Sequence, residues 1–84
     1  MRRIAVIGAV LENPHETQEE FNRVVSDNMD IVKGRNGTPF EKEGIGVVSL
    51  TVMADMDRIN DFTGKLGALP NISVKTAVSK KEVE

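Results

Sequence analysis

The chain of 84 residues contains no cysteine, tryptophan or tyrosine, and His15 is its only histidine. Without cysteine there can be no disulfide bond, thiolate metal ligand or cysteine nucleophile, and nothing indicates an oxidising compartment. No apolar run approaches the ~20 residues that a membrane-spanning helix requires. We therefore expect a cytoplasmic protein without a membrane segment.

An excess of positive charge is also lacking. The 11 Lys and Arg residues are outnumbered by 13 Asp and Glu, which gives a net charge of -2. Such a mixed surface does not favour a polyanion as partner. RNA-recognition modules stack bases on aromatic side chains of their central strands. Phe21, Phe40 and Phe62 all lie outside the segments that we predict as central strands, so we expect no direct nucleic-acid binding.

Groups for catalysis and metal binding are sparse as well. No Ser-His-Asp, Cys-His or paired-carboxylate site can be assembled from the residues present. Asp55, Asp57 and Asp61 lack the spacing of a calcium-binding loop. A lone His15 in the first turn of a helix is more typical of a solvated side chain than of a metal ligand. We predict a non-enzymatic protein without a metal or cofactor.

The clearest pattern that is present runs from Asp55 to Ser79. Asp55 is a good N-cap, and the apolar residues that follow it recur at helical spacing. We place the end of this helix at Gly67, in the left-handed conformation of a C-terminal cap, because Pro70 forbids continuation. From Ile72 to Ser79 the period changes to two, which predicts a strand. The apolar stripe of the helix consists of Met56, Ile59, Phe62 and Leu66.

Upstream, four further elements can be predicted. Residues 3–11 are apolar at both parities, which is typical of a central strand covered on both sides. Asn13, Pro14 and Glu16 form a helix-start signature, with Asn13 as N-cap. A glycine-rich strand at about 30–35 belongs at a sheet edge, and the long run 45–54 predicts a second central strand.

The resulting order βαββαβ predicts a single domain, residues 1–84, of the α+β class with a ferredoxin-like fold. The four-stranded antiparallel sheet should have the strand order 4-1-3-2, with both helices on one face. The other face would then be open and apolar, which usually marks a partner surface. We expect a homo-oligomer, either a dimer or a dimer of dimers packed sheet to sheet. The residues predicted for this interface are Ala5, Ile7, Ala9, Leu11, Val47, Thr51 and Met53.

The segment Gly34-Arg35-Asn36-Gly37 has two interpretations. It can be an edge bulge, which the glycines favour. It can also be an arginine-bearing loop that receives an anion, which the nearby Lys33 supports. Both interpretations remain open at the level of sequence.

Three segments together resemble the iron-only hydrogenase system regulator family, and the similarity extends over nearly the whole chain. They read GRNGTP at 34–39, GIGVVSLTV at 44–52 and TGKLGALPNISVKT at 63–76. The resemblance implies an ACT-like fold, related to the C-terminal regulatory domain of nickel-responsive repressors, and an association with maturation of iron-only hydrogenases. Those repressors hold metal with histidine and cysteine, so their metal site is not expected here. Nor do we expect a DNA-binding domain within these 84 residues.

Two functional hypotheses follow. The first is an oligomeric regulatory module that binds a small anionic or amino-acid-like ligand near the loop between the first strand and the first helix. Glu12, Asn13 and His15 of that loop, with Arg35 of the adjacent edge, are the predicted ligand-binding residues. The alternative is a protein-interaction subunit without a ligand pocket that docks a hydrogenase-maturation partner.

Overall fold

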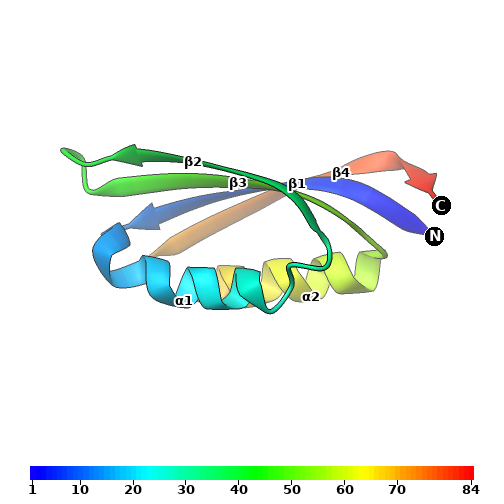
Figure 1. Cartoon of the computed structure of the whole chain (residues 1–84), viewed down its shortest axis with the longest axis horizontal. Coiled ribbons are helices and arrows are strands. Elements are labelled where there is room, and N and C mark those ends of the chain that lie inside the picture. Colours follow the sequence, from blue (N-terminus) through cyan, green and yellow to red (C-terminus); the bar gives the residue numbers. More distant parts are fainter.

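The computed structural model describes all residues 1–84, and its helices cover one face of a single sheet (Figure 1). The strand order is β2-β3-β1-β4 with antiparallel neighbours, so the predicted ferredoxin-like α+β fold and its strand order are confirmed. No helix is long and apolar enough to cross a membrane. The elements are β1 (Arg2–Glu12), α1 (Pro14–Ser26), β2 (Val32–Phe40), β3 (Ile45–Ala54), α2 (Met56–Gly67) and β4 (Ile72–Val83).

The hydrophobic core lies between the helices and the sheet. Phe21 of α1 and Phe62 of α2 are completely buried there, against a sheet in which Ile7 of β1 pairs with Leu50 of β3. Full burial of one such side chain contributes about 1.5–3 kcal/mol. The apolar stripes of the two helices therefore hold them on this face.

The predicted faces of β1 are wrong. Its residues Ala5, Ile7, Ala9 and Leu11, which we assigned to the open face, are buried beneath the helices. The alternate residues of β1 are exposed instead: the accessible fraction is 42% for Ile4, 47% for Val6 and 39% for Val10. Both faces of β1 are apolar, so the alternation of residues along the strand could not show which face is buried. The small side chains of the two alanines suit the face on which helices must approach closely.

The β3 part of the predicted open face is correctly placed. The register pairs Val47 with Val10, Thr51 with Val6, and Met53 with Ile4. Directly paired residues of antiparallel strands point to the same face. The open face of the sheet therefore carries these β3 residues together with the exposed parity of β1.

The two helices begin differently. At α2 the prediction is confirmed, because the Asp55 carboxylate accepts a hydrogen bond from the Arg58 amide at 2.9 Å. At α1, Asn13 has a left-handed backbone (φ 52°) and its side chain makes no capping bond, so the predicted side-chain cap is wrong. The Thr17 hydroxyl donates to the carbonyl oxygens of Glu12 and Asn13 instead, and it thereby ties the first turn to the end of β1.

Other boundaries also differ from prediction. Gly67 is the last residue of α2, and Ala68 follows in the right-handed region, so no left-handed cap forms there. Asn71, with φ 63°, makes the turn into β4. The strand predicted at 30–35 is β2 at Val32–Phe40, with a register irregularity between Val32 and Gly34. It is an edge strand, as predicted, and an edge tolerates Pro39.

The loop between α1 and β2 is tied to α2 by Arg58. Its guanidinium donates to both carboxylate oxygens of Asp30, at 2.7 and 3.0 Å, and also to Oδ1 of the buried Asn28. Asn28 in turn donates to the Val24 carbonyl oxygen at 2.9 Å. Hydrogen bonding to Arg58 lowers the pKa of Asp30, since it favours the ionised carboxylate.

Candidate functional site

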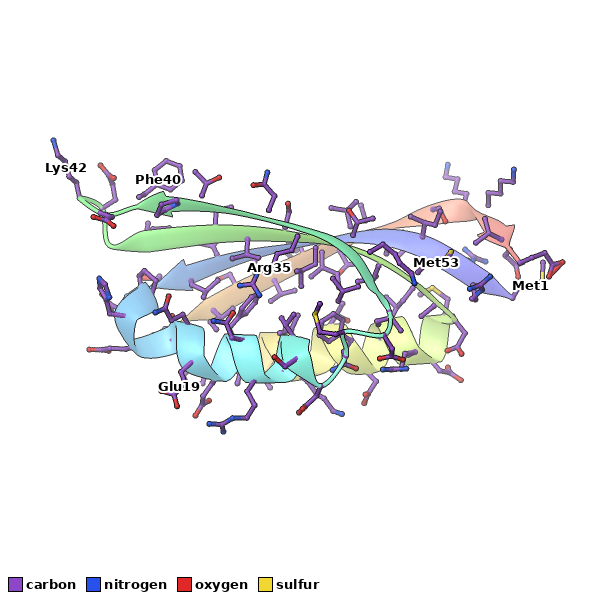
Figure 2. The ribbon with its side chains drawn as sticks, in the orientation of Figure 1. Met1, Glu19, Arg35, Phe40, Lys42 and Met53 are labelled. Atoms are coloured by element: carbon purple, nitrogen blue, oxygen red, sulfur yellow. The ribbon has the colours of Figure 1, made fainter.

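A cleft of about 450 Å³ opens between α1 and the hairpin formed by β2 and β3. His15, Gln18 and Asn22 line it from the helix, and Arg35 lines it from β2. Figure 2 shows the Arg35 side chain in the space between β2 and α1. A volume of this size lies within the range of about 300–1,000 Å³ found for small-molecule sites.

Two glycines on the floor of the cleft stand where side chains would project toward α1, and Gly37 is the one that leaves open space. Gly37 lies on the same face of β2 as Arg35, and it pairs with Val48 of β3. Gly46 lies beside the start of α1, where a Cβ atom would sit 3.5 Å from the Pro14 Cβ atom. On Gly37, a Cβ atom would meet nothing nearer than 4.0 Å. A side chain at position 37 would therefore occupy the cleft without a clash.

Arg35 is held in place by two contacts on α1. Its Nη2 donates to Asn22 Oδ1 at 2.7 Å, and its guanidinium carbon lies 5.8 Å from the centre of the Phe21 ring. None of the four salt bridges in the structure involves Arg35. A guanidinium carries five N–H donors in a planar fork. Most of this fork is therefore free to bind a carboxylate or phosphate oxygen at the cleft.

Three of the four predicted ligand-binding residues line this cleft. Asn13 and His15 come from the start of α1, and Arg35 comes from β2. Glu12 does not line it and pairs with Ile45 in the sheet. Residues 34–37 form part of strand β2 and not a loop. The register is irregular between Val32 and Gly34, as the edge-bulge interpretation predicts, and Arg35 lines the cleft. Binding of an anion by Arg35 stays a prediction.

Sequence reasoning missed the polar residues on α1 that complete the site. Gln18 and Asn22 were assigned to no function, yet they line the cleft with His15. Positions 15, 18 and 22 are three and four residues apart, so they share one helix face. The same spacing that identifies an apolar stripe could have identified this polar one. Glu16 and Glu41, which also line the cleft, were missed as well.

The cleft combines one free cation, two carboxylates, three carboxamides and an imidazole with apolar side chains that include Leu11, Pro39 and Val48. No group of three or more His, Cys, Asp or Glu side chains that could hold a metal ion occurs in the structure. The arrangement can bind and orient a small polar ligand by charge-assisted hydrogen bonds.

A family model described as "TM1266-like: Iron-only hydrogenase system regulator, putative" matches residues 3–76. The chain belongs to this TM1266-like family. Its structure is also similar to that of the uncharacterized protein TM1266 from Thermotoga maritima, with a TM-score of 0.91 and 25% sequence identity over 95% of this chain and 100% of that chain. No curated protein matches the chain. All residues that line the cleft fall within the segment matched by the TM1266-like model.

Proposed function

We propose that this TM1266-like protein is a non-enzymatic, cytoplasmic regulatory module of an iron-only hydrogenase system. It binds a small anionic or amino-acid-like ligand in the cleft between α1 and the β2–β3 hairpin. The observation that carries the proposal is the Arg35 guanidinium, which lines a cleft of about 450 Å³ without a carboxylate partner. A planar fork of this kind binds carboxylates in a bidentate way.

Binding in the cleft would change how firmly β2 is attached to the helices. The bond from Arg35 to Asn22 is the only side-chain hydrogen bond between β2 and α1. A ligand that contacts Arg35 on one side and His15 or Asn13 on the other would add bonds across the same gap. Ligand binding would thus couple the position of the hairpin to the rest of the domain, which is what a regulatory module requires.

A thermal-shift screen of the full chain tests this proposal. Carboxylates, amino acids and inorganic phosphate are added one at a time, and a ligand present at 100 times its Kd should stabilise the protein by about 2.7 kcal/mol. For a domain of this size, that raises Tm by roughly 10–20 °C. Arg35→Gln should abolish the shift. Lys33→Gln is the matched control, since Lys33 lies on the same strand outside the cleft. Absence of stabilisation by every compound would overturn the proposal.

We further propose that a second copy covers the open sheet face. Four strands about 4.8 Å apart, each with about ten residues at about 3.3 Å, span roughly 600 Å². Two such faces would bury roughly 1,200 Å², at the lower end of stable interfaces. The exposed apolar side chains on this face include Ile4, Val6 and Val10. Thr51 and Met53 of the predicted interface join them, whereas Ala5 and Ile7 cannot, because they are buried.

Light scattering at micromolar concentration tests the assembly. The wild type should scatter as a dimer or tetramer of the 9.2 kDa chain. Val6→Glu places a charge at the centre of the open face and should yield a monomer. Asn60→Glu adds the same charge on the exposed side of α2 and should leave the assembly intact. A wild-type monomer would refute the self-association.

The alternative, a protein-interaction subunit without a ligand pocket, is favoured by one feature of the open face. Phe40, 44% exposed, extends the apolar surface along β2 toward the tip of the hairpin, on the side away from the helices (Figure 2). A wild-type monomer that co-purifies with a hydrogenase-maturation protein, and a Val6→Glu variant that does not, would establish this alternative.

A further inference from the structure

The two ends of the cleft carry opposite charges. Glu16 lies in the first turn of α1, and Glu41 follows β2 at the hairpin turn. The first turn of α1 and the hairpin turn lie at the same end of the molecule (Figure 1). Arg35 lies farther along β2, above the middle of α1 (Figure 2). Among its Arg, Lys, Asp and Glu residues, the lining has one positive and two negative side chains, which disfavours a polyphosphate.

The distance between these charges is long for a small molecule. Arg35 and Glu41 are six residues apart, which corresponds to about 20 Å along an extended strand. An extended polypeptide reaches at most about 3.3–3.6 Å per residue. Three or four residues of extended peptide therefore fit between the two charges.

The walls between the charges suit a peptide backbone. Asn13, Gln18 and Asn22 line the cleft, and each carboxamide offers both a donor and an acceptor. These groups match the alternating N–H and C=O groups of a peptide. On the floor, Gly37 allows a backbone to approach closely, because it projects no side chain and a Cβ atom there would meet nothing nearer than 4.0 Å.

We propose that the cleft binds the carboxyl-terminal segment of a partner polypeptide in extended form. The terminal carboxylate pairs with Arg35, and a basic side chain about three residues earlier pairs with Glu41 and Glu16. This inference rests on the proposed function, since it uses the same cleft, and it specifies which ligand class enters it. The partner is defined by a free carboxylate and a nearby cation on one extended segment.

Calorimetric titration of the full chain with synthetic peptides tests the inference. The reference is an N-acetylated pentapeptide with a free carboxylate and a lysine three residues before its end. Its C-terminal amide should bind at least about tenfold weaker, because charge-assisted bonds to Arg35 are lost. Replacing the peptide lysine by glutamine should weaken binding about threefold or more, as expected for more exposed charges.

Protein variants locate each contact. Arg35→Gln should remove the preference for the acid over the amide, and Glu41→Gln should reduce the preference for lysine over glutamine. Gly37→Leu fills the floor and should weaken every peptide at least about tenfold by steric exclusion. Gly64→Leu is the matched control, because Gly64 lies on the exposed side of α2 outside the cleft, where an added Cβ atom would meet nothing within 4 Å. Circular dichroism confirms that each variant is folded.

The outcomes separate this inference from the proposed function. If free lysine or malonate binds more tightly than the peptide, or the amide binds as well as the acid, the peptide class is wrong and the small-ligand site remains. If inorganic phosphate binds best, the charge reasoning is wrong. If neither peptides nor small anions bind, both proposals are overturned.

Discussion

Two isoleucines on the same strand provide a direct test of which face of β1 is covered. Ile7 is completely buried and pairs with the equally buried Leu50, whereas Ile4 is 42% exposed on the opposite face. The same substitution, isoleucine to alanine, can therefore be compared at both positions. The two variants lose identical atoms from one strand, so any difference in their stability reports the environment of each side chain.

The expected magnitudes follow from burial. Truncating Ile7 removes three buried carbons at about 0.8 kcal/mol each, and the cavity that remains adds to the cost. We expect Ile7→Ala to lower the free energy of unfolding by about 2.5–4 kcal/mol. In the monomer, Ile4→Ala should cost about 1 kcal/mol or less, since much of that side chain already contacts water. At about 4–8 °C per kcal/mol, the Tm of Ile7→Ala should fall by roughly 10–30 °C.

Urea unfolding followed by far-ultraviolet circular dichroism is the suitable assay, because the chain has no tryptophan or tyrosine to report by fluorescence. Measurements at two protein concentrations separate folding from association, which would add a concentration-dependent cost at Ile4. At the lower concentration, an Ile4→Ala variant that is less stable than Ile7→Ala would refute the assignment of faces. It would place the helices on the other side of β1.

Three further predictions concern the helix ends and the Arg58 contact. Asp55→Ala should lower the free energy of unfolding by about 0.5–2 kcal/mol, visible as a lower urea midpoint, because it removes the N-cap bond to the Arg58 amide. Asn13→Ala should cost about 1–2 kcal/mol, because alanine strains a left-handed backbone, whereas Asn13→Gly should be nearly neutral in the same assay. The pKa of Asp30 is lower in the folded protein than its ordinary value of 3.8. Ionised Asp30 therefore stabilises the fold at pH values above 3.8, and this contribution disappears as the pH falls through the lower folded pKa. Stability measured below about pH 4 should therefore fall less steeply in Arg58→Gln than in the wild type; equal slopes would show that Asp30 gains nothing from Arg58.

Most of the fold could be predicted because local signals agreed with the global pattern. The helix at Met56–Gly67 has a capping aspartate, an apolar stripe and a change of period after Pro70, and all three are local. The strand order then follows from the element order and from the hand of the crossovers. These signals required no knowledge of which residues meet in space.

The face of β1 could not be predicted in the same way, since it depends on register. Ile4, Val6 and Val10 are as apolar as the residues on the buried face of β1. The composition of the strand therefore does not show which of its two faces the helices cover. The register resolves the choice by pairing Ile7 with Leu50, both completely buried. Such pairings are long-range, and no periodicity within a single strand contains them.

The cleft arises from the part of the chain whose structure was hardest to predict. The helices pack on β1, β3 and β4, and β2 lies at the edge beyond them. Beyond Val32, which packs against the core, the inner face of β2 is not buried by a helix, and it carries Arg35, Gly37 and Pro39. Gly37 and Arg35 weaken the strand pattern in the sequence. In the structure, Gly37 leaves space in the cleft and Arg35 supplies its cation. In a small sheet covered by two helices, a poorly patterned edge strand therefore indicates where a ligand can enter.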